Sequence, residues 1–186
     1  MKAWVARFPP ALGMALVWLC VTGCAGALPP SSFAASTPRL DPEAFFAGRT
    51  HSWAMLQSGD GAPNRPMTVE GLGQAQPDGS FRLDQTTTSN GASETRTWII
   101  RRLDEHRYRA SLTSAAGPVE GEAYGNLLHF KYALKGKPGV VIEQWLYLQP
   151  DGRTVLNEDV VRAFGLVIFR LSEIITHDGP PVASAP

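Results

Sequence analysis

The sequence predicts an all-β domain in which an antiparallel meander of about eight to ten strands closes into a barrel. Three observations support this prediction. Apolar and polar residues alternate with a period of two in many short stretches, turn residues separate these stretches, and a short helical turn precedes them. Such alternation is typical of strands with one buried and one solvated face, and closure of the sheet leaves no exposed edge.

Residues 1–23 predict a signal peptide of the lipoprotein type. Lys2 and Arg7 give a basic start, an apolar run follows, and small residues precede Cys24. The run is shorter than the roughly 20 apolar residues that a membrane-spanning helix needs. Cleavage would leave Cys24 as the first residue, where its thiol would be lipidated and would anchor the protein to a membrane. An ordinary secretory signal, cut a few residues later, is the alternative interpretation.

The segment Val21-Thr22-Gly23-Cys24 resembles the bacterial lipobox. By resemblance to enterobacterial lipoproteins, the Ala25 that follows implies the outer membrane, with the domain facing the periplasm of the cell envelope. Residues 24–39 are rich in Pro, Ser and Ala and predict a flexible tether. The barrel domain is expected over 40–177, and the tail 178–186 is expected to be disordered.

One helical turn is expected near the start of the domain, because Asp41 can cap it and Pro42 suits its first position. The alternation and the intervening turns then place strands near 49–58, 66–75, 80–88, 94–102, 106–115, 118–124, 127–135, 140–148, 153–161 and 164–176. Strong turn signals are Pro77-Asp78-Gly79 and Pro150-Asp151-Gly152. The last segment also fits helical spacing, so its type stays open.

From Phe46 onward the chain resembles the DUF3833 family of bacterial lipoproteins. The matching stretches are Phe46-Ala47-Gly48, Arg96-Thr97-Trp98, Gly121-Glu122-Ala123-Tyr124-Gly125-Asn126, Trp145-Leu146-Tyr147-Leu148, Asn157 and Phe164-Gly165. The resemblance implies a lipocalin-like, calycin-type barrel, and by fold analogy a lipophilic ligand. The family usually carries an acidic pair before its second tryptophan, where this chain has Glu143-Gln144.

Composition excludes several classes of function. Removal of Lys2 and Arg7 with the leader would leave 15 basic and 17 acidic residues, a net charge of −2, so no basic excess favours nucleic acid. With Cys20 in the leader and Cys24 lipidated, no thiol remains for a disulfide or a nucleophile. The four histidines lack metal-ligand spacing and no nucleophile-elbow motif is present, so we expect neither a metal nor another cofactor.

Aromatic side chains in the predicted strands form the candidate ligand site. They would either line a cavity for an apolar molecule or fill a solid core. The candidates are Trp53, Phe81, Trp98, Tyr108, Phe130, Tyr132 and Trp145.

Two charged residues join these candidates. Arg96 shares a strand face with Trp98 and could bind an acidic head group, stack on that ring, or pair with a local acid. Glu143 shares a face with Trp145, but the strand is apolar on both faces, so the direction of Glu143 stays open.

The sequence therefore predicts a membrane-anchored envelope lipoprotein that binds or shields a fatty-acyl or other lipid-like ligand. A non-catalytic structural or interaction protein of the cell envelope is one alternative. An enzyme acting on envelope lipids, with an inward acid such as Glu143, is a second. The sequence identifies no protein partner.

Overall fold

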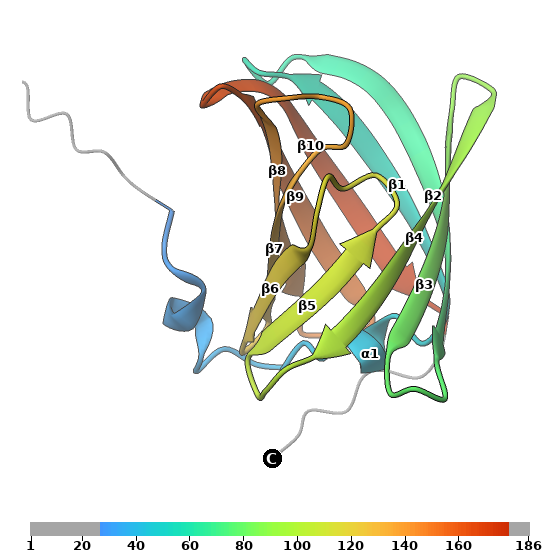
Figure 1. The fold of residues 1–186 in the computed structure, drawn as a ribbon, viewed down its shortest axis with the longest axis vertical. Coiled ribbons are helices and arrows are strands. Elements are labelled where there is room, and N and C mark those ends of the chain that lie inside the picture. Colours follow the sequence, from blue (N-terminus) through green and yellow to red (C-terminus); the bar gives the residue numbers. More distant parts are fainter. Residues whose placement is uncertain (1–26, 179–186) are drawn as a thin grey trace, which may run out of the picture.

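The computed structural model describes residues 27–178, and its strands form a closed antiparallel barrel (Figure 1). Each strand pairs with its neighbours in sequence, and β1 pairs with β10 to close the sheet. The strands are β1 (Gly48–Ser58), β2 (Pro63–Ala75), β3 (Phe81–Ser89), β4 (Ala92–Arg102), β5 (Arg107–Leu112), β6 (Val119–Tyr124), β7 (Leu127–Ala133), β8 (Val140–Leu148), β9 (Thr154–Ala163) and β10 (Leu166–His177). The predicted all-β meander is confirmed, and its last segment is a strand rather than a helix. The signal peptide, Cys24 and the tail after Asp178 lie outside the described residues.

The turns form where the sequence signals place them. In the link between β2 and β3, the Asp78 carboxylate accepts a hydrogen bond from the Ser80 backbone N–H at 3.0 Å. Gly79 takes a φ of +76°, which glycine adopts without steric cost. The same carboxylate also accepts from the Ser80 hydroxyl at 2.6 Å. These bonds help to fix the turn, and the turn fixes the register of the two strands that it joins.

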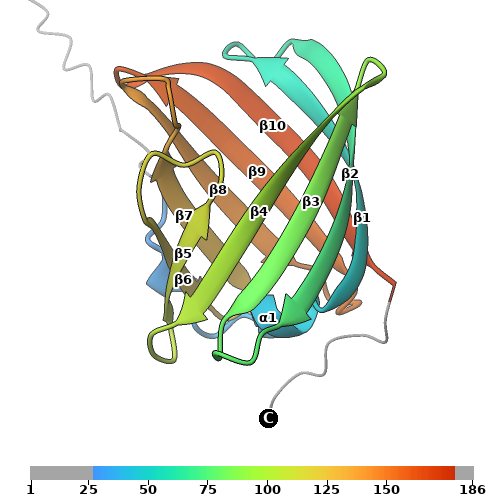
Figure 2. The same ribbon diagram turned by 45° about the vertical axis from the view of Figure 1, so that its right-hand side comes forward.

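A short helix, α1 (Pro42–Phe45), closes one end of the barrel (Figure 2). Asp41 caps it as predicted, accepting hydrogen bonds from the backbone N–H groups of Glu43 and Ala44. Phe45 is fully buried and packs edge-on against Phe46. Gly73 of β2 makes this position possible, because a Cβ there would clash with the carbonyl oxygen of Phe46. We call this end of the barrel the closed end and the other the open end.

Part of the expected tether has defined structure. Residues Pro30–Phe33 form a 3-10 helix, η1, that lies on the outside of the barrel against β6 and β7 (Figure 1). The Phe33 ring lies 5.7 Å from the ring of Tyr147. The Leu40 backbone N–H donates to the carbonyl oxygen of Gly125 at 2.8 Å. The chain between Pro30 and Leu40 is therefore attached to the barrel wall by apolar packing and by a backbone hydrogen bond. Within residues 27–178, no helix is long and apolar enough to cross a bilayer.

Candidate functional site inside the barrel

The closed half of the barrel interior is filled by side chains. The buried cluster there includes Phe81, Trp98, Tyr108 and Phe130, four of the predicted site residues. The rings of Trp98 and Phe130 lie 5.2 Å apart. Gly121 on β6 leaves room for them, because a Cβ there would clash with the Phe130 ring. The packed-core interpretation therefore holds for these four aromatic residues.

The open half of the interior is hollow. A cavity of about 490 Å³ lies there, within the range of typical small-ligand pockets. Its wall carries the apolar side chains of Met67, Leu134, Ile142 and Leu171, together with the ring of Tyr132. Below it, among the aromatic residues, only about 30 Å³ is empty. Both sequence interpretations of the interior thus apply, each to one half of the barrel.

A layer of inward-facing polar residues separates the two halves, and we call it the polar floor. It consists of Gln85 on β3, Arg96 on β4, Gln144 on β8, Asn157 and Asp159 on β9, and Glu173 on β10. All of them except Arg96 are buried, and Arg96 is half-buried. Polar groups in such a place need hydrogen-bond partners, because burial removes water from them.

Hydrogen bonds satisfy most of this layer. The Gln85 side-chain oxygen accepts from Arg96 Nε at 2.8 Å and from Trp98 Nε1 at 3.0 Å. Glu173 accepts from the Ser52 hydroxyl and, at 2.9 Å, from Asn157 Nδ2. In place of the expected stacking on Trp98 or pairing with a local acid, Arg96 Nε and Trp98 Nε1 share one acceptor, the Gln85 side-chain oxygen.

Two buried oxygens of the floor, Asn157 Oδ1 and Asp159 Oδ1, have no hydrogen-bond partner among the described residues. Of the two residues only Asp159 is ionisable, and its Oδ2 accepts from Gln144 Nε2 at 3.0 Å. The pKa of Asp159 is raised to about 7, mainly by burial and also by the nearby negative charge of Glu173, while Gln144, Arg96 and Asn157 act to lower it. Near neutral pH this carboxyl therefore exchanges between neutral and ionised forms at the wall of the cavity.

Tyr132 lies between the floor and the open half. Burial raises the pKa of its phenol to about 12, so the hydroxyl keeps its proton and can donate a hydrogen bond. Tyr132 is thus the one aromatic candidate that both packs on the Trp98 ring, at 5.8 Å, and lines the cavity.

Three predicted site residues face away from the interior. Trp53 is 57% exposed on the outside of β1. On β8, Glu143 and Trp145 point outward because the inward positions are those of Gln144, Leu146 and Leu148. The expectation that these three line an interior cavity is corrected, because each stands one residue out of phase with the buried side of its strand.

On the outside, Glu143 and Trp145 contact His129. The Glu143 carboxylate lies 3.1 Å from His129 Nε2, and the Trp145 ring lies 4.1 Å from the imidazole ring. Burial under these neighbours lowers the pKa of His129 below its ordinary value, although Glu143 acts in the opposite direction. This cluster joins β7 and β8 on their outer face.

Sequence reasoning missed most of the polar floor. Asp159 follows Glu158 directly in the sequence, and the two face opposite sides of β9, so their adjacency does not indicate a shared site. The functional neighbours of Asp159 lie on other strands: Gln144 stands opposite Asp159 on β8, and Glu173 stands opposite Asn157 on β10. One sequence feature could have indicated the floor: a polar residue at a position where the alternation of the strand places apolar ones. Glu173, between Leu171 and Ile175 on the same face of β10, is an example. Among residues 27–178, no group of His, Cys, Asp and Glu is arranged to hold a metal ion.

Comparison with known proteins places the chain in a family. The DUF3833 model, described as a protein of unknown function, matches residues 18–177. The chain belongs to the DUF3833 family. No curated protein matches the sequence.

Solved structures with a similar fold are distant in sequence. The S-type phycobiliprotein lyase CPES of Guillardia theta superimposes with a TM-score of 0.58 at 9% identity, covering 76% of this chain and 95% of the lyase. A protein of unknown function from the DUF3598 family of Nostoc punctiforme gives a TM-score of 0.54 at 13% identity, covering 76% of this chain and 50% of that protein. At such identities the similarity concerns the fold alone, which here is a closed antiparallel barrel.

Proposed function

We propose that this DUF3833 protein is a lipid-anchored protein of the bacterial cell envelope that binds one amphipathic, fatty-acyl-like molecule in the open half of its barrel. The observation that carries this proposal is the half-hollow interior, in which a cavity of about 490 Å³ ends on a polar floor with an unpartnered buried oxygen. A purely structural barrel would gain stability by filling this space, since buried voids forgo packing interactions.

The cavity has one place for an acyl chain and another for a head group. Met67, Leu134, Ile142 and Leu171 offer apolar surface toward the open end, where burial of the chain would contribute about 25 cal/mol per Å². At the floor, Arg96 uses Nε for Gln85, which leaves its terminal nitrogens to donate to a ligand. A carboxylate fits these donors in bidentate fashion.

Asp159 would complete the head-group site in its neutral form. A protonated Asp159 can donate from Oδ1 to the ligand carboxylate, whereas an ionised Asp159 would repel that carboxylate. The Glu173 carboxylate is stabilised by hydrogen bonds from the Ser52 hydroxyl and Asn157 Nδ2. The proposed head-group site thus needs the proton on Asp159, and its affinity for a fatty acid should weaken as the pH rises through the pKa of about 7.

The likeness to a phycobiliprotein lyase supports a small hydrophobic ligand by analogy of fold. The basic start, the apolar run and the small residues before Cys24 support the anchor, and Ala25 supports the outer membrane with the domain facing the periplasm. Two or three acyl chains on Cys24 would hold the protein firmly, since each buried methylene contributes about 0.8 kcal/mol.

Uptake of cis-parinaric acid, a fluorescent fatty acid, tests the interior site. We expect one probe per chain, displaced by unlabelled oleic acid more readily than by oleyl alcohol and least by oleylamine. Arg96→Gln should abolish the preference for the acid, while Arg101→Gln, which alters an exposed arginine bound to Asp78 on the outside, should leave it intact. Absence of uptake by the native protein, or a preference for the amine, would refute the proposed function.

A further inference from the structure

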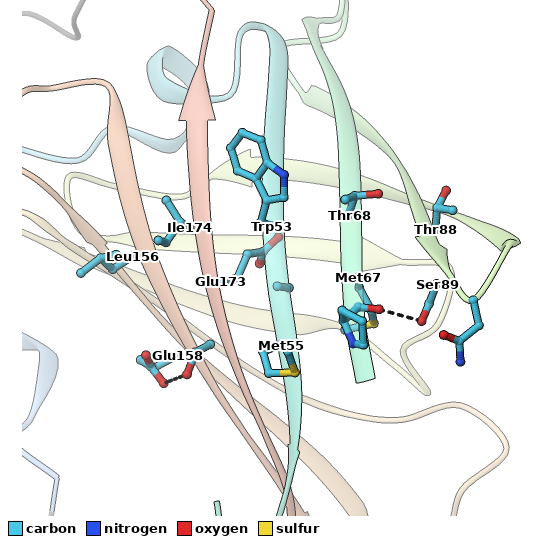
Figure 3. A pocket seen from close by; sticks show the side chains of 14 residues that line it. Trp53, Met55, Met67, Thr68, Thr88, Ser89, Leu156, Glu158, Glu173 and Ile174 are labelled. Carbon is cyan, nitrogen blue, oxygen red and sulfur yellow. Dashed lines mark hydrogen bonds between the residues drawn. The ribbon is translucent and has the colours of Figure 1, made fainter. Parts of the chain in front are cut away.

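Apolar side chains form a continuous row on the outside of the barrel. Trp53 on β1 stands opposite Ile174 on β10, which stands opposite Leu156 on β9. These three residues, which we call the outer strip, are 57%, 48% and 39% exposed. Figure 3 shows them side by side. They line a groove whose volume is about 650 Å³. Exposed apolar groups in a contiguous row are typical of interaction surfaces.

The outer strip continues toward the beginning of the described chain. Leu156 stands opposite Tyr147 on β8, and Tyr147 packs on Phe33 of η1. Ala27 and Leu28 share a hollow with Phe33, Tyr147 and Trp145, so the chain reaches the barrel at the end of the strip. Leu28 is itself 63% exposed, which adds apolar surface at this point.

The number of residues between Cys24 and this face limits what can cover the outer strip. Cys24 precedes Ala27 by three residues, and three residues span at most about 11 Å when fully extended. An acyl group on Cys24 would therefore hold the wall formed by β8, β9, β10 and β1 close to the membrane. From Pro30 onward the chain is attached to the barrel wall. Residues 30–39 therefore do not serve as a free spacer that would let the barrel stand away from a bilayer.

The charges around the strip agree with a lipid surface. None of the fourteen residues that line the groove is a lysine or an arginine. On the outer side, Glu158 is the charged member, and it accepts a hydrogen bond from the Ser172 hydroxyl at 3.0 Å (Figure 3). Trp53 lies between Ile174 on β10 and Thr68 on β2, and its ring packs edge-on against His51 at 4.2 Å. A tryptophan with apolar neighbours on one side and polar neighbours on the other suits the interfacial layer of a bilayer, where its ring is apolar and its N–H can reach water.

We propose that the outer strip inserts into the surface of the bilayer to which the protein is anchored, so that the barrel lies on its side with Trp53, Ile174 and Leu156 among the lipid head groups and upper acyl chains. The occupant of the strip is thus a lipid surface, and it is recognised through apolar burial rather than through charge. This inference rests on the proposed lipid anchor but not on the proposed ligand of the interior.

Tryptophan quenching in proteoliposomes tests this orientation. The acylated full-length protein is reconstituted in phosphatidylcholine with and without bromine atoms on the upper acyl chain, and the quenched part of the emission is measured. We expect Trp53→Phe to remove more than half of the quenched emission. Trp98→Phe, which removes an indole from inside the barrel, should leave the quenched emission in place. Replacement of a third of the lipid by anionic phosphatidylglycerol should change the quenching by less than a quarter.

A matched pair of leucines sharpens the test. Leu156 in the strip and Leu72 on the outside of β2 are both 39% exposed, so substitution of either by Glu should leave the barrel folded. Leu156→Glu should at least halve the quenching of Trp53, and Leu72→Glu should leave it unchanged. Equal effects of the two substitutions, or a Trp53 unquenched in the acylated protein because a second copy or another protein covers it, would overturn the inference. A mass spectrum that shows no acyl group on Cys24 would refute the anchor and this inference together, and would leave the interior site standing.

Discussion

The closed and open halves of the barrel interior are built by the same strands and differ in what those strands place inside. Along β3 the inward residues change from Phe81 and Leu83 at the closed end to Gln85 and Thr87 toward the open end. Along β4 they change from Ile100 and Trp98 to Arg96. Large apolar side chains thus fill one half, while the smaller and more polar ones leave the other half hollow. Because the inward residues change in character along each strand, a single meander supplies both a stable core and a candidate site.

The largest expected difference between the halves concerns stability. Leu148 is fully buried at the closed end, so Leu148→Ala should lower the free energy of unfolding by about 2–5 kcal/mol. Leu171 lines the cavity and is only half-buried, so Leu171→Ala should cost less than about 1 kcal/mol. Urea unfolding followed by circular dichroism measures both values. Equal losses would show that the open half is packed as tightly as the closed half.

Filling the hollow should separate ligand binding from stability. Leu171→Trp places a bulky ring in the cavity, so it should abolish uptake of cis-parinaric acid while the unfolding midpoint changes little. Leu83→Trp, in the filled half, should instead destabilise the barrel by about 1–3 kcal/mol through overpacking. Undiminished uptake by Leu171→Trp would place the ligand elsewhere on the molecule.

The buried acid of the polar floor should give the protein a pH-dependent stability. Its pKa is about 7 in the folded barrel and near 3.8 in the unfolded chain, so the folded protein holds the extra proton between these values. The contribution of Asp159 to the free energy of unfolding is therefore fully present below about pH 4. It is lost as the pH rises toward 7, by up to about 1.4 kcal/mol per pH unit. Asp159→Asn should remove this slope. Unfolding curves measured from pH 4 to 8 would count against the buried acid if both proteins gave the same slope.

The order of the elements could be read from the sequence because alternation and turn chemistry are local signals. All ten expected strands are present, and Asp41 caps the helical turn as its sequence context predicts. The sequence did not predict which face of β8 points into the barrel. Leu146 and Leu148 make one face apolar, and Trp145 and Tyr147 make the other face aromatic. The structure shows why both faces are apolar: one packs inside the barrel, and the other packs against His129 and η1.

The candidate site was only partly accessible from sequence. Arg96 and Tyr132 were found because each stands in the inward phase of its strand. Asp159, Gln144 and Glu173 were missed because the floor is assembled across β8, β9 and β10, and its members become neighbours only through strand register. Trp53 was assigned to the interior on residue type, although its neighbours Ser52 and Ala54 are the ones that face inward.

The smallest expected effect concerns the outer face of β8. Because Glu143 lies outside the barrel against His129, Glu143→Gln should leave fatty-acid uptake unchanged within about twofold. The substitution also removes the ion pair of Glu143 with Lys131 Nζ, 4.0 Å away, and loss of such a pair at the surface typically costs no more than about 1 kcal/mol. A large loss of uptake in this variant would mean that the site includes the outer face, contrary to the division described above.

A crystal structure of the protein purified from its native host tests the half-hollow barrel most directly. We expect elongated electron density in the open half, with one end within hydrogen-bond distance of Arg96 and Asp159 and the rest along Met67 and Leu171. An open half that holds only water, or that is closed by inward collapse of its side chains, would contradict the claim that this barrel is a container for a small amphipathic molecule.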